Sequence, residues 1–147
     1  MTNKLKVLLA DDDMDDCMFF KEAFEELDIS ASLTIVNNGV ELMRYFVQNQ
    51  NSFPDVIYLD LNMPLKNGYD CLSEIKNNTL LQHLPVIIYS TCYDKTIADR
   101  LYQDGAHYYI QKPAEFSNLK KILLRSITFL FQHKQLQPPK EEFIIFN

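Results

Sequence analysis

The stretch "VIYLDLNMP", Val56–Pro64, is a short apolar run that ends in the acid Asp60 and meets a proline four residues later. A continuous apolar run of this length predicts a strand that is buried on both faces. Asp60 could cap the turn that follows, because Pro64, Asn67 and Gly68 are ordinary loop residues. A buried strand has no structural need for a carboxylate at its end, however, so Asp60 is also a candidate for chemistry.

Short apolar runs of the same kind alternate with amphipathic stretches along the rest of the chain. The expected strands are 6–10, 32–36, 55–59, 86–89 and 107–110, and the expected helices are 14–27, 38–48, 69–77, 94–103 and 115–133. Five strand–helix units joined by short loops predict a parallel sheet. We expect an α/β fold, a doubly wound (βα)5 sheet of five strands in the flavodoxin-like order 2-1-3-4-5, with helices on both faces.

Composition limits the kinds of partner. The chain of 147 residues carries 14 basic and 20 acidic residues, a net charge of −6, which argues against non-specific binding to DNA or to an anionic membrane. No apolar run approaches the roughly 20 residues of a membrane span, and the N-terminus has no signal-peptide pattern. We therefore expect a cytoplasmic protein. Cys17, Cys71 and Cys92 have no metal-binding spacing, and we expect small buried side chains there.

Acids, hydroxyls or a lysine follow four of the five expected strands, and the second strand is followed only by Asn37 and Asn38. In an open parallel sheet, the carboxyl ends of the strands form one edge, where functional groups gather. Carboxylates that converge there repel one another unless a cation lies between them, and Mg²⁺ prefers such oxygen ligands. A lysine opposite the metal would complete a pocket for a phosphoryl group. The strand-end residues are Asp11, Asp12 and Asp13 after the first strand, Asp60 after the third, Ser90 and Thr91 at the fourth, and Lys112 after the fifth.

Each of these residues also has an ordinary structural interpretation. Capping of the first helix is the favoured role for Asp13 taken alone. Asp11 and Asp12 could form a solvated acidic turn, and Lys112 could be a surface lysine. The interpretations are reasonable one by one, but together they do not explain why all these groups fall at the same edge of one sheet.

Four separate stretches resemble the receiver domain of two-component response regulators, especially the stand-alone chemotaxis type. They are "LLADDD", "YLDLNMPLKNG", "PVIIYST" and "GAHYYIQKP", and the resemblance covers about 4–133. It implies a receiver domain over residues 1–134. Residues 135–147 would be a tail without a separate output domain, and Pro138 and Pro139 bar a longer helix there.

The resemblance implies a role for each matching residue. Asp60 would be the phosphoacceptor. The metal, Mg²⁺ or in its place Mn²⁺, would bind Asp12 directly, Asp11 through water, Asp60 and the backbone carbonyl of Asn62. Lys112 would neutralise the phosphoryl group, and its bond to Pro113 is commonly cis in the family. Ser90 and Thr91 would bind phosphoryl oxygens, and Tyr109 would be the aromatic switch residue that follows Ser90.

The implied function is signalling by phosphorelay. Asp60 would take a phosphoryl group from a phosphohistidine on a sensor histidine kinase or a histidine phosphotransfer protein, and water would later remove it. The protein would therefore modify itself and would not be an enzyme. The signal would leave through the face formed by helix 94–103, strand 107–110 and helix 115–133. That face would contact an unknown downstream protein or form a homodimer.

Three other functions compete with this interpretation. An aspartyl-phosphate hydrolase would need a second acid two residues after Asp60, where Asn62 stands. A flavin-binding module would need a phosphate-binding loop after the first strand, where "DDDMDD" would repel phosphate. A receiver used only as a scaffold would not need the intact set of site residues. The stretch "FIIF" near the end of the chain is expected to cover the extra apolar residues of the last helix, Leu124, Phe129 and Phe131. Without that cover, these residues would form a surface for a partner or a dimer.

Overall fold

The computed structural model describes residues 4–146 and contains one fully parallel six-stranded sheet. The strand order is β2-β1-β3-β4-β5-β6. The strands are β1 (Leu5–Ala10), β2 (Ala31–Val36), β3 (Val56–Leu59), β4 (Val86–Ser90), β5 (Tyr108–Gln111) and β6 (Ile144–Ile145). The first five strands have the expected order, and the expectation of five strands is wrong by one, because the tail adds β6.

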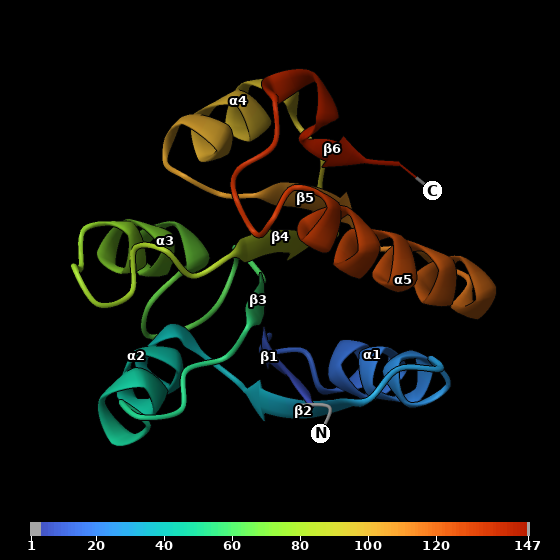
Figure 1. Ribbon diagram of the computed structural model, residues 1–147, viewed down its shortest axis with the longest axis horizontal. Coiled ribbons are helices and arrows are strands. Elements are labelled where there is room, and N and C mark those ends of the chain that lie inside the picture. The colour runs from blue at the N-terminus through green and yellow to red at the C-terminus, as the bar shows by residue number, and fades with distance from the viewer. Residues whose placement is uncertain (1–3, 147) are drawn as a thin grey trace.

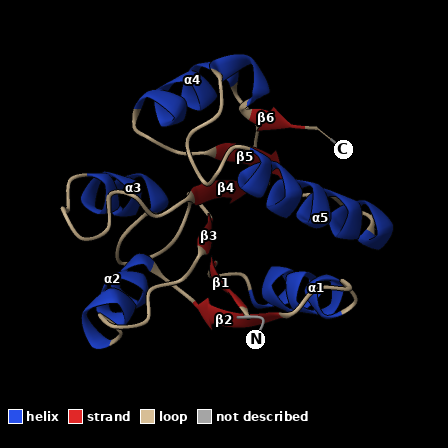
Figure 2. Cartoon of the chain, in the orientation of Figure 1, coloured by secondary structure: helices blue, strands red, loops and turns tan. Residues whose placement is uncertain are grey.

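Helices cover both faces of the sheet, as expected (Figure 1 and Figure 2). Helices α1 (Met14–Glu25) and α5 (Phe116–Gln132) lie on one face. Helices α2 (Gly39–Gln48), α3 (Gly68–Lys76) and α4 (Lys95–Gln103) lie on the other. This arrangement leaves the carboxyl ends of the strands free to form a site.

Successive strand residues face opposite helix layers, which explains the continuous apolar runs. Leu8 of β1 belongs to the cluster under α2, α3 and α4, whereas Val7 and Leu9 belong to the cluster under α1 and α5. Because both faces are covered, both sets of side chains must be apolar. The buried tyrosine of "VIYL" is no exception, since the Tyr58 hydroxyl lies 2.6 Å from the Ser126 hydroxyl of α5.

Side-chain caps fix where four of the helices begin. In α1 to α4 the residue before the helix accepts a hydrogen bond from a backbone N–H three residues on, which satisfies a donor that the helix itself cannot. The caps are Asp13, Asn38, Asn67 and Asp94. The predicted cap role of Asp13 is therefore confirmed, with Asp13 Oδ1 3.0 Å from the amide nitrogen of Asp16.

The tail folds back, but not over the surface that the sequence suggested. Phe143 and Ile145 are buried, and β6 pairs with the outer edge of β5. Leu124 and Phe131 of α5 remain 45% and 50% exposed, so the expectation that "FIIF" covers them is wrong. The physical reason is that β5 would otherwise be an open edge whose backbone groups lack partners.

One of the three cysteines is not buried as the sequence predicted. Cys17 and Cys71 are buried as expected, but Cys92 is exposed, because it lies in the loop after β4.

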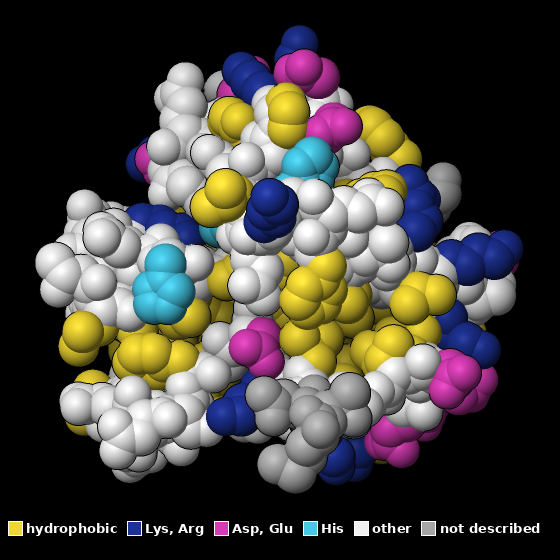
Figure 3. Space-filling model, viewed as in Figure 1, with side chains coloured by type: hydrophobic (Ala, Val, Ile, Leu, Met, Phe, Trp, Pro, Cys, Tyr) yellow, Lys and Arg dark blue, Asp and Glu magenta, His cyan; other side chains and the backbone are white. Residues whose placement is uncertain are grey.

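On the face seen in Figure 3, apolar side chains gather around a hollow of about 260 Å³ between α2 and α3. Across residues 4–146, every helix is too short or too polar to cross a membrane.

His107 is a buried histidine just before β5, and its hydrogen bonds fix it in the neutral form. The backbone N–H of Val86 points at Nδ1 from 3.4 Å, so Nε2 carries the proton and donates to the carbonyl of Gln135, 3.1 Å away. Burial, together with the charge of Lys76, lowers the pKa of His107 from 6.5 to about 4. Protonation would place a second N–H against the Val86 amide.

This histidine should make the protein less stable in mild acid. Its lowered pKa favours the folded state above pH 6.5, and this contribution is lost as the pH falls towards 4. The loss is about 3 kcal/mol of unfolding free energy. We expect urea denaturation between pH 7 and pH 4 to show a shallower decline for His107→Gln than for the parent. The exposed His83→Gln is the control, and an unchanged slope in His107→Gln would contradict the assignment.

Candidate functional site

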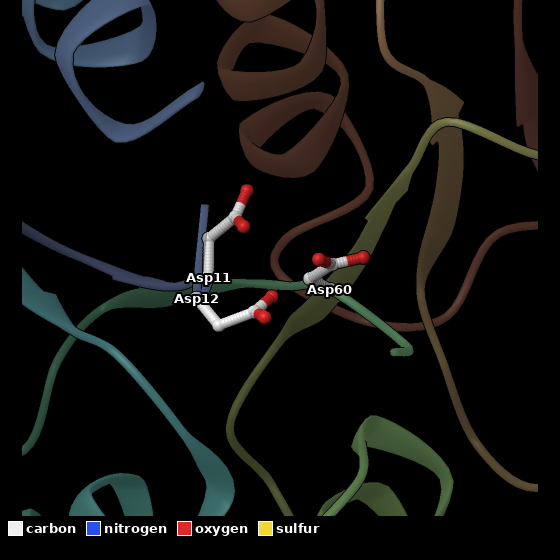
Figure 4. Close-up of side chains that lie close together, drawn as sticks. All are labelled: Asp11, Asp12 and Asp60. Atoms are coloured by element: carbon white, nitrogen blue, oxygen red, sulfur yellow. The ribbon is translucent and has the colours of Figure 1, made fainter. Parts of the chain in front are cut away.

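Three carboxylates meet at the carboxyl ends of β1 and β3. Asp11 and Asp12 follow β1 and Asp60 follows β3, and one carboxylate oxygen from each lies within 4.8 Å of the others (Figure 4). Asp11 and Asp60 are buried, whereas Asp12 is exposed. The sequence prediction that these three residues converge is confirmed.

Backbone and side-chain contacts hold Asp60 rigidly at the end of β3. Its backbone N–H donates to the carbonyl of Ala10, and its Oδ1 accepts from the Leu61 amide at 2.8 Å. The chain then turns back so closely that a Cβ on Gly68 would lie 2.2 Å from the Asp60 carbonyl oxygen. Only glycine fits there. The loop thus leaves the Asp60 carboxylate projecting from a fixed strand end.

Burial sets the protonation behaviour of Asp60. The residue is only 6% exposed. Burial, together with the charge of Asp11, raises the pKa of Asp60 to about 6, and the nearby Lys112 opposes this rise. The carboxylate therefore remains mostly ionised at neutral pH, which is the form in which a carboxylate can act as a nucleophile.

Lys112 is the positive charge in the site. Its ammonium nitrogen lies 2.7 Å from Asp11 Oδ2, 2.8 Å from Asp16 Oδ2 and 3.5 Å from Asp60 Oδ2. Its side chain is 7% exposed and passes over the Tyr89 ring. Burial alone would lower the pKa of Lys112, but its close contacts with the carboxylates of Asp11 and Asp16 raise it above the usual value, so the lysine stays charged.

The acidic cluster fits a divalent cation. Asp11 Oδ2 is fully buried and contacts Lys112 as an ion pair, yet it receives no directed hydrogen bond from the described residues. Carboxylate oxygens with spare lone pairs are the ligands that hard cations prefer. Asp12 and Asp60 border a cavity of about 520 Å³ with room for water, whose lining also includes Asn62, Thr91 and Lys112.

The remaining predicted residues lie behind the cavity. Ser90 is buried at the end of β4, where its Oγ accepts a 3.4 Å hydrogen bond from the Cys92 amide. Tyr109 is buried in β5, and its hydroxyl donates to the Cys92 carbonyl. Peptide bonds among the described residues are all trans, including Lys112–Pro113, so the cis bond implied by the resemblance is not found.

Asp16 is the residue that sequence reasoning missed. It lies in the first turn of α1, three residues after the cap Asp13, and its carboxylate binds Lys112 from outside the three-carboxylate cluster. The first turn of a helix that follows β1 faces the same strand ends as Asp11 does. The spacing within "DDDMDD" could therefore have indicated a fourth acid, although not its partner.

Comparison with known proteins identifies the family. Residues 7–124 match the response regulator receiver domain. The chain belongs to this family. Response regulator Rcp1 of Synechocystis sp. is 30% identical over 122 residues, which are 80% of this chain and 82% of Rcp1. The sensor histidine kinase CheAY of Helicobacter pylori is 31% identical over 82% of this chain, but that region is only 15% of the kinase.

Solved receiver structures share the fold and support a metal site. The phosphorylated cyanobacterial phytochrome response regulator RcpA is similar with a TM-score of 0.78 and 29% identity, over 92% of this chain and 99% of RcpA. The Mn²⁺-bound form of Rcp1 has a TM-score of 0.74 and 28% identity, over 90% and 98% of the two chains. This receiver thus belongs to two-component signalling, and its acidic cluster fits the binding of a divalent cation.

The Asp16–Lys112 ion pair should strengthen cation binding. In Asp16→Asn, Lys112 would turn to Asp11 and Asp60 and compete with the cation for their oxygens. A partly exposed ion pair contributes about 1 kcal/mol, so we expect Mg²⁺ or Mn²⁺ to bind about fivefold more weakly in calorimetric titration.

Asp15→Asn is the matched control for this prediction. It removes the same charge one residue away, from an exposed side chain that lines the same cavity but makes no ion pair with Lys112. We expect less than a twofold change in this variant. Equal weakening in both variants would show that Asp16 acts only through its long-range charge.

Proposed function

We propose that this receiver domain accepts a phosphoryl group on Asp60 from a phosphohistidine of a sensor histidine kinase or a histidine phosphotransfer protein. The observation that carries the proposal is the position of the buried Asp60 carboxylate, which lies close to the Asp11 and Asp12 carboxylates and 3.5 Å from the Lys112 ammonium. A nucleophile beside both a candidate cation site and a fixed positive charge suits phosphoryl transfer, which depends mainly on position and charge neutralisation. Because kinases of this type use ATP, we place the exchange in the cytoplasm.

The transfer needs few groups. An ionised oxygen of Asp60 attacks phosphorus, the phosphorus–nitrogen bond of the phosphohistidine breaks, and its electron pair returns to the imidazole. The product is an acyl phosphate on Asp60, which water later hydrolyses to the carboxylate and inorganic phosphate. Asp60 is consumed and regenerated, and no separate substrate is turned over, so "enzyme" is not the right term.

The charged groups have separate tasks. Mg²⁺ held by Asp11, Asp12, Asp60 and the Asn62 carbonyl would supply positive charge for the phosphoryl oxygens. Lys112 supplies a second positive charge, because its raised pKa keeps it protonated. Thr91 lines the cavity and would offer its backbone N–H, while Ser90 would move towards the phosphoryl group from behind.

The output would be a shift of Ser90 and Tyr109 that alters the face formed by α4, β5 and α5. Both residues are buried and share the Cys92 backbone as a hydrogen-bond partner, which couples them physically. A downstream protein or a second copy of the chain would read this face. Its α4–β5 part is covered by the tail.

Phosphorylation can be measured on the intact protein. After incubation with acetyl phosphate and Mg²⁺, we expect a mass gain of one phosphoryl group, because a small donor can replace the phosphohistidine. The gain should disappear with EDTA, and it should disappear in Asp60→Asn, which lacks the nucleophilic oxygen.

Asp28→Asn is the matched control for this experiment. Asp28 is exposed after the far end of α1, so it should be modified like the parent. Modification of Asp60→Asn, or of the parent in EDTA, would overturn the proposal.

A further inference from the structure

Residues 137–146, called the tail segment below, are bound along α4, β5 and α5. The segment adds β6 to β5 in parallel, with Ile144 beside Tyr109 and Ile145 beside Ile110. The Tyr109 amide donates to the Phe143 carbonyl at 3.0 Å. On α5, Arg125 donates to the carbonyl of Phe146. The segment therefore occupies the surface that the proposed function assigns to output.

Hydrogen bonds outside the strand also hold the tail segment. Gln137 Nε2 donates to the carbonyls of Tyr102 and Ala106, at 2.7 and 2.8 Å. The Tyr102 hydroxyl donates to the Pro138 carbonyl at 2.7 Å. Lys140 lies 3.4 Å from Asp99 of α4. Side chains of both the tail segment and α4 take part in these contacts, as in the binding of a peptide to a protein surface.

Phe143 is the anchor of the tail segment. It is 2% exposed, and its ring packs edge-on against Tyr102 at 5.2 Å and against Tyr109 at 6.4 Å between ring centres. Phe146, three residues later, is 66% exposed. Burial of one aromatic ring thus provides much of the apolar contact of the segment.

A short chain of contacts joins this anchor to the site. The Cys92 amide donates to Ser90 Oγ, and the Cys92 carbonyl accepts from the Tyr109 hydroxyl. The Tyr109 ring lies between Tyr93, at 5.6 Å, and Phe143. The backbone of Cys92 thus connects Ser90 at the end of β4 to the ring on which Phe143 packs.

We propose that the tail segment is an intramolecular ligand of the α4–β5 surface, and that phosphorylation of Asp60 weakens its binding. This inference rests on the proposed function. When Ser90 moves towards the phosphoryl group, Cys92 shifts, Tyr109 loses its hydroxyl partner, and Phe143 loses its packing. The surface then becomes available to a protein segment that pairs with β5 and carries an aromatic side chain in place of Phe143.

Thermodynamic linkage gives the inference a second consequence. If phosphorylation weakens the tail segment, weakening the tail segment must favour the phosphorylated conformation by the same factor. Substitutions that weaken binding of the tail segment, although they lie outside the cavity, should therefore change how readily Asp60 is phosphorylated.

Hydrogen exchange tests the first consequence. In the parent protein with acetyl phosphate and Mg²⁺, amides of residues 140–146 should exchange at least fivefold faster than without the donor, the lower end of usual coupling. Asp60→Asn under the same conditions should show no change. Exchange must be compared with the extent of modification measured by mass in the same samples.

Three substitutions test the second consequence. Phe143→Ala should raise the rate of mass gain at low acetyl phosphate about fivefold, because a larger fraction of the protein then has the conformation that accepts the phosphoryl group. Phe146→Ala, in the same segment but exposed, should match the parent. Tyr102→Phe removes only the hydrogen bond to Pro138 and should raise the rate about twofold, which keeps the test available if Phe143→Ala fails to fold.

The outcomes separate this inference from the proposed function. If the parent protein gains no mass, both the proposed function and the inference are overturned. With a mass gain but unchanged exchange and unchanged rates in Phe143→Ala and Tyr102→Phe, the proposed function stands and the inference fails. A third outcome would also overturn the inference. If the tail amides lose their protection from exchange on dilution, and light scattering shows a dimer at high concentration, the tail segment binds a second copy of the chain.

Discussion

Repulsion between carboxylates at one end of the sheet is the constraint on which the site depends. Asp11 and Asp60 are both buried, and Asp12 lies beside them, so their negative charges must be balanced within the protein or by a bound cation. In the structure Lys112 provides that balance through contacts with Asp11 and Asp60. The same lysine lines the cavity as a nearly buried side chain, where the proposed function would have it face the phosphoryl group.

Asp16 gives Lys112 a partner outside the acidic cluster. A cation that binds Asp11, Asp12 and Asp60 would weaken their attraction for the lysine and would repel it. Asp16 can still hold Lys112 in place, because its carboxylate lies outside the three-carboxylate cluster, on α1. The site therefore combines a cation position with a separately anchored lysine, and the two positive charges need not compete for the same oxygens.

The tail and the site are connected through β4 and β5. Ser90 ends β4, and its partner in the register is Gln111, the last residue of β5. Tyr109 on β5 contacts the Cys92 backbone on one side and Phe143 of the tail on the other. The outermost strand of the sheet, β6, thus pairs with the same residue that contacts the loop after β4. Because β5 is the last strand of the five-unit fold, covering its edge also protects it from unwanted pairing.

The sequence by itself determined the features that depend on local chemistry. Apolar runs such as "VIYL" specify strands buried on both faces, the caps Asp13 and Asn38 specify where helices begin, and strand-end residues specify the site edge. These signals are readable because each depends on a few neighbouring residues, or on the rule that parallel strands end at one edge. Residues Asp11, Asp12, Asp60 and Lys112 were found in this way.

Only the tertiary structure decided the contacts between segments distant in the chain. The ion pair of Asp16 with Lys112 spans 96 residues, and the pairing of β6 with β5 joins the tail to residues far before it. The exposure of Leu124, Phe131 and Cys92 follows from where the tail packs and how the loop after β4 lies. A short apolar segment such as "FIIF" can bury its side chains against several surfaces, and its choice depends on which strand edge and which aromatic rings the completed fold leaves uncovered.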